Sequence, residues 1–273
     1  MAVLSFSSAK GGVGKTTLAV NVAVEFALRG ISACVLDCDL NQHATQFGEA
    51  FGPSYPEVPV RFVGGVNKAN IIRRLKEADV EHDVVAIDLP AGTSELSLRA
   101  IMMSSLVVIP AQMTSLDVKD AARTAIQISE ASELSGHHIP SVLVWTMVGT
   151  RFETTTERIV REGLVSMLTD PSRAILSAPL LRYDAYPAGF VHGFVPRQVA
   201  AWAGKSAFLP GSPLDPVRIP PSAFRAAENI AAVADGMLAR LQAISRGEDP
   251  GRVCVLPEVI DEIRRASAGQ ETA

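Results

Sequence analysis

Aromatic residues are scarce in this sequence: Phe, Trp and Tyr together make up 5% of its 273 residues. Since the apolar fraction is nevertheless 48%, a hydrophobic core must be built mainly from Ala, Val, Leu and Ile. This composition favours helices packed on buried parallel strands over an aromatic-rich β-sandwich. A charged fraction of 20% excludes both a disordered chain and a coiled coil.

Cysteine is also rare, and Cys34, Cys38 and Cys254 lack the paired spacing of a zinc site. Their odd number favours a reduced, cytoplasmic setting. The first residues lack the basic segment and apolar run of a signal peptide. The longest uncharged stretch, 100–116, is interrupted by proline and polar residues and is too short for a membrane span. We therefore expect a cytoplasmic protein outside the membrane.

Short apolar segments alternate with helical patterns along the first half of the chain. The expected strands are 3–7, 32–37, 83–88, 106–110 and 141–148, and the clearest helices are 17–29, 67–78 and 116–135. This order predicts βαβ units and an α/β fold of three layers, with a doubly wound, mostly parallel sheet. Ligand sites in such sheets lie where the strands end.

The C-terminal part is organised differently. The segment 204–221 is rich in Pro and Gly and predicts a long surface loop rather than a linker between domains. Ser222 can cap a final amphipathic helix. We expect one domain over 1–246 and a tail over 247–273, whose short helix either docks on the body or serves a partner or a membrane surface.

A glycine-rich segment follows the first expected strand. Residues 10–16 read K-G-G-V-G-K-T, and Ala9 stands where the usual P-loop has its first glycine. The deviant pattern K-G-G-x-G-K-[ST] matches at every position. Glycines allow the backbone to curl so that its N–H groups point at phosphate oxygens. The predicted phosphate cradle consists of Gly11, Gly12, Val13 and Gly14.

The helix that follows this loop supplies side chains for the same site. Its N-terminus favours an anion, and Lys15 adds a charge for the β- and γ-phosphates. The Thr16 hydroxyl is placed to ligate Mg²⁺, and Thr17 can reach the α-phosphate. The pattern predicts nucleotide binding.

Three acids end neighbouring expected strands. Asp88 stands where a Walker B acid would hold Mg²⁺ through water. Asp37 and Asp39 flank Cys38, and strand alternation points both toward the phosphates. Asp37 is therefore a candidate metal ligand, with capping of the next turn as the alternative. Cys38 is interpreted as a small strand residue.

These motifs together resemble the ParA/MinD superfamily of deviant Walker ATPases. They are residues 10–16, Asp37-Cys38-Asp39 and Ile87-Asp88-Leu89-Pro90; the stretch 93–122 and R-Y-D-A-Y at 182–186 are similar to the VirC branch. The resemblance implies a P-loop NTPase fold of the SIMIBI type, with ATP and Mg²⁺ as cofactors. It also implies slow ATP hydrolysis stimulated by a partner or by DNA.

The resemblance implies particular roles as well. Lys10 would reach across an ATP-bound homodimer to the partner's phosphates, and Asp39 would position the attacking water, so that Lys10, Lys15 and Asp39 are the catalytic candidates. The segments after Asp39 and Asp88 would be switches, with Gly92 sensing the nucleotide. Both depart from the usual form: residues 40–45 read L-N-Q-H-A-T instead of P-Q-G-N-A-T, and D-L-P-A replaces D-x-P-P.

Charge is unevenly distributed. The formal net charge is −4, but 171–225 carries +4 and the remainder −8. The resemblance implies a nonspecific DNA surface here, made of phosphate contacts; the alternative is that these arginines only keep the surface soluble. The DNA-binding candidates are Arg182, Arg197, Lys205, Arg218 and Arg225. We expect a nucleoid-associated protein that positions a plasmid, a transfer complex or other cargo, with a ParB-like or relaxosome component as stimulating adaptor.

Other functions fit less well. MinD-like membrane binding requires a strongly apolar C-terminal helix, and this chain ends in A-G-Q-E-T-A. A metabolic P-loop ligase would need a carboxylate-binding site, for which the sequence has no mark. The cysteines do not match those that bridge a nitrogenase iron protein. His137 and His138 are interpreted as turn residues, and His43 as a solvated residue of the first switch.

Overall fold

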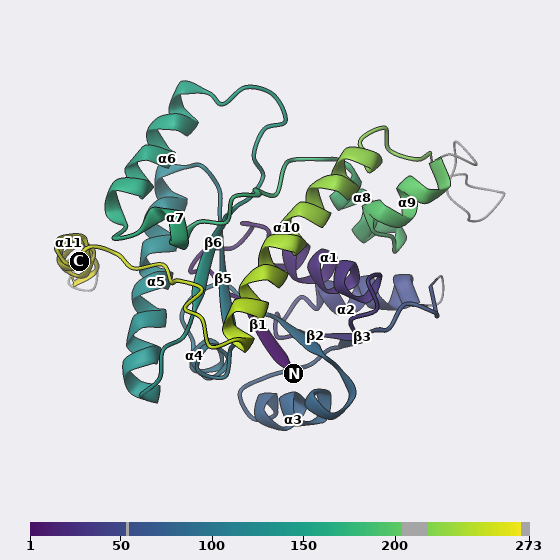
Figure 1. The fold of residues 1–273 in the computed structure, drawn as a ribbon, viewed down its shortest axis with the longest axis horizontal. Helices are drawn as coiled ribbons and strands as arrows, with labels where there is room; N and C mark the ends of the chain where they lie inside the picture. The colour runs from purple at the N-terminus through teal and green to yellow at the C-terminus, as the bar shows by residue number, and fades with distance from the viewer. Residues whose placement is uncertain (53–54, 204–217, 269–273) are drawn as a thin grey trace.

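A computed structural model of the chain describes residues 1–52, 55–203 and 218–268 (Figure 1). Its centre is a six-stranded sheet with the order β3-β2-β4-β1-β5-β6, and all strand pairs are parallel. The strands are β1 (Ala2–Phe6), β2 (Ala33–Asp37), β3 (Val60–Val63), β4 (Val84–Asp88), β5 (Leu106–Ala111) and β6 (Ser141–Trp145). Chain order reverses about β1, so the sheet is doubly wound as predicted.

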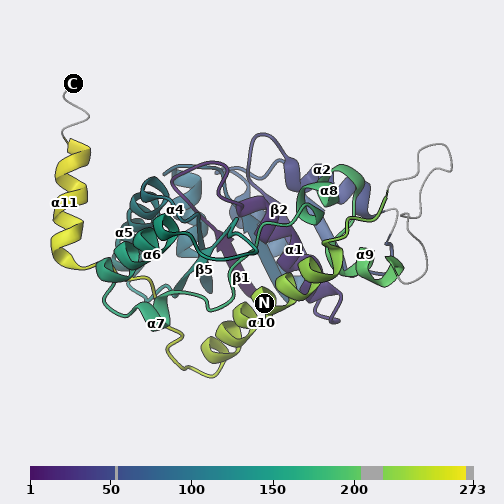
Figure 2. The same cartoon turned by 90° about the horizontal axis from the view of Figure 1, so that it is seen from above.

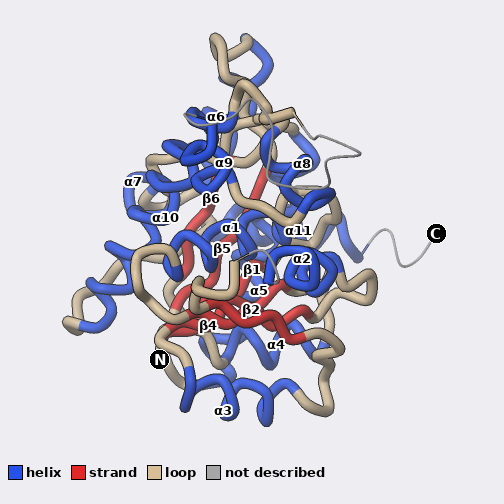
Figure 3. The backbone as a smooth tube through the Cα atoms, turned by 90° about the vertical axis from the view of Figure 1, so that its right-hand side faces the viewer, coloured by secondary structure: helices blue, strands red, loops and turns tan. Residues whose placement is uncertain are grey.

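Helices cover both faces of the sheet, and in Figure 3 the strands form a band between two groups of helices. One face packs against α1 (Lys15–Ala27), α2 (His43–Phe51), α8 (Ala185–His192) and α10 (Ala223–Ser245). The other face packs against α3 (Ile71–Glu81), α4 (Glu95–Met102), α5 (Ser115–Ser135) and α6 (Thr155–Met167). Three shorter or peripheral helices complete the fold: α7 (Pro171–Ala174), α9 (Pro196–Ala203) and α11 (Pro257–Ala268).

Alternation along the strands explains the two cores. In β1, Leu4 and Phe6 face the core that includes α1 and α10, whereas Val3 faces the core under α3. Each strand of this sheet contributes to both sides in this way. The core is mainly aliphatic, as the composition predicted. An exception is the group of Phe47, Phe51 and Phe62, whose rings pack together between α2 and β3.

The five expected strands are present, with ends shifted by one to three residues. The expected strand 141–148 ends at Trp145 because Thr146 turns its hydroxyl toward the carbonyl of Val13, and Met147 has a positive φ of 55°. The expected helix 67–78 begins only at Ile71. Asn67 and Asn70 form a turn before the helix instead: the Asn67 N–H donates to Asn70 Oδ1 at 2.8 Å, and Asn70 Nδ2 donates to the carbonyl of Gly65 at 3.0 Å.

Several described elements lie in segments for which no strand or helix was expected: β3, α2, α4, α6, α7, α8 and α9. Two of them lie beside the predicted site, β3 at one edge of the sheet and α2 directly after the second strand's acids. Gly48 lets α2 lie against β3, because a Cβ at this position would overlap the Phe62 side chain. These two elements complete the side of the sheet next to Asp37.

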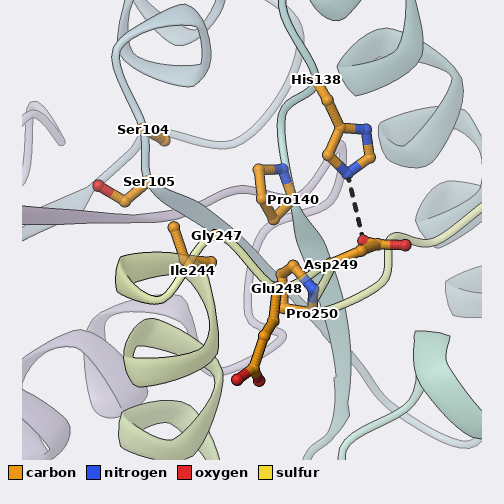
Figure 4. A pocket seen from close by; sticks show the side chains of 9 residues that line it. All are labelled: Ser104, Ser105, His138, Pro140, Ile244, Gly247, Glu248, Asp249 and Pro250. Carbon is orange, nitrogen blue, oxygen red and sulfur yellow. Dashed lines mark ion pairs between the residues drawn. The ribbon is translucent and has the colours of Figure 1, made fainter.

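The C-terminal segment crosses the amino-terminal edge of the sheet. The Val253 N–H donates to Ser141 Oγ at 2.9 Å, and the Thr169 N–H donates to the carbonyl of Cys254 at 3.0 Å. A pocket of about 400 Å³ lies beside this crossing, where His138 Nε2 stands 3.8 Å from Asp249 Oδ1 (Figure 4). This pocket is at the opposite edge from the glycine-rich loop.

The tail helix α11 packs against α5 through Val259, Ile260 and Ile263, at the periphery of the molecule (Figure 2). The division into 1–246 and 247–273 remains a prediction. Most of the predicted loop 204–221 lies outside the described residues. None of the helices within the described ranges is sufficiently long and apolar to cross a membrane.

Candidate nucleotide-binding site

The glycine-rich loop joins β1 to α1 at the carboxyl edge of the sheet. Gly12 and Gly14 have positive φ angles of 75° and 91°, which explains glycine at both positions. Neighbouring strand ends fix the loop: the Thr146 hydroxyl donates to the carbonyl of Val13 at 2.7 Å, and Gln112 Nε2 donates to that of Gly12 at 2.9 Å. The curled loop therefore leads directly into the N-terminus of α1, which favours phosphate binding.

Lys15 is the first residue of α1 and is only 7% exposed. Its Nζ donates to the carbonyl of Lys10 at 3.1 Å, on the opposite side of the loop. Burial lowers the pKa of Lys15, and the carboxylates of Asp88 and Asp39 oppose this shift. The ammonium group thus lies within electrostatic range of both acids, at the point where phosphate would enter.

Asp88 ends β4 as an orphaned carboxylate. It is 1% exposed, and neither oxygen has a hydrogen bond within normal limits. Burial raises its pKa to about 7, while the nearby Thr16 hydroxyl and Lys15 act in the opposite direction. A buried carboxylate without a partner is stabilised by a cation or a proton.

These residues fit a magnesium ion carried by a phosphate group. Thr16 and Asp88 would supply a hydroxyl and a carboxylate, which are oxygen ligands that Mg²⁺ prefers. No group of three or more His, Cys, Asp or Glu among the described residues could hold a metal by itself. The ion would therefore depend on phosphate and water oxygens in addition to the protein.

Asp37 is completely buried and already engaged. Its Oδ2 accepts from the Thr45 N–H at 2.9 Å and from the Thr45 hydroxyl at 3.0 Å, and its Oδ1 accepts from the Asp39 N–H at 3.1 Å. Thr45 is the third residue of α2, so Asp37 caps this helix from the adjacent strand. This is the alternative that the sequence left open, and a metal contact by Asp37 remains a prediction.

Asp39 lies at the start of the first predicted switch. Its Oδ1 accepts from the backbone N–H and from Nδ2 of Asn41, both at 2.9 Å. In the second predicted switch, Gly92 has a φ of 91° and its N–H donates to the carbonyl of Ser8 at 3.2 Å. The second segment is therefore bonded to the residues before the glycine-rich loop, whereas Asp39 bonds within its own segment and acts on Lys15 through its charge.

Lys10 does not point into its own loop. Its Nζ lies 3.1 Å and 3.2 Å from the two carboxylate oxygens of Asp117, in the first turn of α5. The Asp117 side chain is 1% exposed and the Lys10 side chain 40%. The Thr114 hydroxyl also bonds to Asp117. The sequence analysis did not identify Asp117 as a partner of Lys10. The spacing of Thr114 and Asp117, a capping residue three positions before an acid, could have placed Asp117 in the first turn of a helix.

A pocket of about 370 Å³ adjoins the loop beside Thr16 and Thr17. His43, the first residue of α2, lines it, together with Pro187 and Phe190 of α8. This pocket has room for the part of a nucleotide beyond its phosphates. His43 is exposed, as expected, but it faces this pocket as well.

The predicted DNA contacts fall into three groups. Arg197 is exposed but already paired, because its Nη2 lies 2.9 Å from Oε1 of the buried Glu25. Lys205 lies outside the described residues. Arg182, Arg218 and Arg225 are exposed and have no carboxylate at ion-pair distance in the described part of the chain.

The remaining candidates have structural roles or none. Cys34 and Cys38 are buried, and burial raises the pKa of Cys34 to about 12, so neither presents a reactive thiolate. His137 and His138 follow α5 in a turn, as expected.

Comparisons with known proteins agree with this geometry. The family model of the VirC1 protein matches residues 1–195. Protein ParA of Rhizobium radiobacter is 32% identical over 195 residues, which is 71% of this chain and 84% of that protein. Protein virC1 of the same organism is 30% identical over 190 residues, 69% of this chain and 80% of that protein.

A solved structure shares the fold. The ATP complex of McdA from Cyanothece superposes with a TM-score of 0.62 at 15% identity, covering 88% of this chain and 96% of McdA. The family model spans the glycine-rich loop, the three acids and Asp117. The chain therefore belongs to the VirC1 family, within the ParA/MinD superfamily of deviant Walker P-loop proteins.

Proposed function

We propose that this protein is an ATP-dependent switch. It binds ATP with Mg²⁺ and forms a homodimer. The dimer associates with DNA without sequence preference, and slow hydrolysis of ATP releases the protein from the DNA. The unpartnered Asp88 beside Thr16 and Lys15 supports the nucleotide–metal part of this proposal. Similarity to a protein solved as an ATP complex favours ATP as the nucleotide.

The contact of Lys10 with Asp117 is the observation that carries the switch. One lysine of the loop, Lys15, remains for the phosphates of its own chain. The other is held 3.1 Å from a buried carboxylate on α5 but keeps an exposed side chain. A cation held reversibly at the carboxyl edge can move to the phosphates of a second copy. The site would then be complete only in the dimer.

The two segments after the strand-end acids would report the nucleotide state. Asp37 and Asp39 connect β2 to α2, so a phosphate or water that moves Asp39 also shifts the start of that helix. Asp39 would orient the attacking water, and Lys10 and Lys15 would neutralise charge on the transferred phosphoryl group. Stimulation by an adaptor of the ParB or relaxosome kind would act on these segments.

The work of such a switch is positional. DNA binding in the ATP state and release after hydrolysis would place a plasmid, a transfer complex or another cargo in the cytoplasm, on the nucleoid. The relatives named ParA and virC1 support this assignment. The exposed arginines Arg182, Arg218 and Arg225 support DNA as the surface that is bound.

Retention on nonspecific duplex DNA tests the proposal. The protein is compared without nucleotide, with ADP, with ATP, and with ATP in the Lys15→Ala and Lys10→Ala variants, and its mass in solution is measured under each condition. We expect a dimer and salt-sensitive DNA retention only with ATP, both lost in the two variants. ATP-dependent flotation with liposomes, or turnover stimulated by a small carboxylic acid but not by DNA, would contradict it.

A further inference from the structure

Two exposed phenylalanines lie beside unpaired arginines at the carboxyl edge of the sheet. Phe152 lies in the loop after β6 and is 96% exposed. Among the large apolar residues described, only Leu40 is equally exposed. Phe224 lies in the first turn of α10 and is 52% exposed. Single exposed apolar side chains are common on protein surfaces, so the indication of a ligand comes from the arginines that lie beside these two. Their surroundings indicate what that ligand is.

Around Phe152 the free side chains are basic. Arg151 and Arg158 are exposed, and no carboxylate of the described residues lies at ion-pair distance from either. The acids between them are engaged: Glu153 pairs with Arg161 at 2.7 Å, and Glu157 accepts from the Thr154 N–H at 2.8 Å in the capping box of α6.

Arg182 connects this loop to the start of α10. Its N–H donates to the carbonyl of Val148 at 2.8 Å, and the Leu181 N–H donates to Asn229 Oδ1 at 2.9 Å. Residues 148–152 and the first turns of α10 are therefore attached to one segment. Figure 1 shows the loop before α6, this segment and the N-terminal end of α10 along the same edge of the molecule.

The start of α10 repeats the chemistry of the loop. Phe224 is adjacent in sequence to Arg225, just as Phe152 is adjacent to Arg151. Arg218, a few residues before Phe224, is also exposed. Three acids of this region have no ion pair among the described residues: Glu157, Asp184 and Glu228. Glu153 and Glu157 also lie within electrostatic range of Arg158 and Arg182. The edge therefore offers five arginines and two stacking surfaces against three carboxylates, and positive charge remains in excess.

We propose that this edge binds a strand of DNA with unpaired bases. The surface, which we call the arginine–phenylalanine edge, consists of Arg151, Phe152, Arg158, Arg182, Arg218, Phe224 and Arg225. Arginines would contact successive phosphates, and the two phenyl rings would stack on exposed bases, which a duplex keeps inside its own stack. The proposal rests on the DNA binding proposed above and adds Arg151, Arg158 and both phenylalanines to it.

The test measures ATP-loaded protein by fluorescence anisotropy with an oligonucleotide of about 30 bases, single-stranded or as the duplex of the same sequence. Phe152→Ala should weaken single-strand binding about 5-fold or more and leave duplex binding within about 2-fold, since stacking contributes roughly 1–3 kcal/mol per base. Phe152→Trp should restore it. Arg158→Ala should weaken both and reduce the salt dependence by about one phosphate contact.

Matched controls lie on other surfaces. Leu134 is an exposed apolar residue at the end of α5, and Lys76 is an exposed cation on α3. Leu134→Ala and Lys76→Ala should leave binding of both DNA forms unchanged. ATP hydrolysis and the mass of the ATP-bound species are recorded for every variant.

The outcomes separate this inference from the proposed function. If the protein retains duplex DNA with ATP but Phe152→Ala binds single strands as the original protein does, the inference is wrong and the DNA switch stands. If Phe152→Ala loses the ATP-bound dimer, Phe152 belongs to the self-association surface, and the inference is again wrong. If neither DNA form is bound in any nucleotide state, both proposals fail.

Discussion

The ammonium group of Lys10 lies 3.1 Å from a carboxylate oxygen of Asp117, which is 107 residues further along the chain. The acid is buried and the lysine is 40% exposed. The ion pair with the buried acid gives the Lys10 side chain a defined position. Because that side chain is partly exposed, a second molecule at the surface can still reach its charge. In the proposed dimer, Asp117 would therefore set how readily Lys10 moves from this contact to the phosphates of the partner chain.

Replacing Asp117 by Asn should make ATP-dependent self-association easier. The amide keeps a polar group for Thr114 but removes the charge that holds Lys10. We expect half-maximal dimer formation at about 3- to 10-fold lower ATP, which corresponds to a change of roughly 1 kcal/mol, as for a partly exposed charge-assisted bond. Light scattering during an ATP titration measures this.

Asp120→Asn is the matched control for that variant. Asp120 lies one turn further along α5 and pairs with Arg123, not with the loop. The control should dimerise at the same ATP concentration as the original protein. A weaker dimer in Asp117→Asn would show that the acid supports the dimer instead of restraining Lys10.

Asp88 should make the nucleotide-free protein less stable as pH rises. Burial raises its pKa to about 7 in the folded state, well above the usual range of an aspartate, so the folded state binds the proton more tightly than the unfolded state does. The free energy of unfolding should therefore fall between about pH 4 and pH 7 and level off above. This cost is at most about 4 kcal/mol.

Asp88→Asn removes this titration. The variant should be more stable than the original protein at about pH 8, and the difference should shrink toward about pH 5. Denaturant unfolding without nucleotide measures both. Addition of Mg²⁺ and ATP should stabilise the original protein at pH 8 but not the variant. An unchanged pH profile in the variant would assign the effect to another group.

The sequence predicted those parts of the fold that depend on local pattern. The strand V-V-A-I-D at 84–88 is apolar up to its final acid because both of its faces are covered, and it is recognisable in the sequence for that reason. The edge strand β3, V-R-F-V, is half-exposed and only four residues long, so its pattern is too weak to read. Helix α2 begins at His43, directly after Gln42, which has a left-handed conformation, and the helix is capped by Asp37 from another element.

The site shows the same division. The loop residues and Asp88 follow from motif and strand position, since each is defined by its immediate neighbours in the chain. Asp117 acts on Lys10 and Thr45 acts on Asp37 only after the fold has brought them together. Contacts between distant segments leave no spacing in a single sequence from which they could be predicted.

The capping role of Asp37 can be separated from metal binding. Asp37→Asn should destabilise the protein by about 2 kcal/mol, because it weakens three hydrogen bonds at the start of α2. Thr45→Val removes only the hydroxyl bond to Asp37, because valine keeps the backbone N–H, so it should cost less, about 1 kcal/mol. Since the two variants share that bond, the loss in the double variant should be less than the sum of the single losses. Additive losses in this cycle would mean that Asp37 stabilises the protein through another contact.

Arg197 should matter for stability and not for DNA. It contacts Oε1 of Glu25, a side chain that is 1% exposed on α1 and also held by Arg29 at 3.0 Å. Burial raises the pKa of Glu25, and both arginines oppose that shift. Because Arg29 remains, Arg197→Ala should cost about 1–2 kcal/mol in the free energy of unfolding, less than the loss of an entire buried pair.

DNA binding by the folded Arg197→Ala variant should keep the salt dependence of the original protein, whereas Arg182→Ala should lower it by about one phosphate contact. Arg182 is the fair comparison, since it is also exposed but has no carboxylate at ion-pair distance among the described residues.

The variant Glu25→Gln tests the same ion pair by changing its acid instead of its arginine. It removes the charge that holds Arg197, and it should strengthen DNA binding if Arg197 then turns outward. A reduced salt dependence in Arg197→Ala would instead mean that the arginine leaves Glu25 for phosphate when DNA is present.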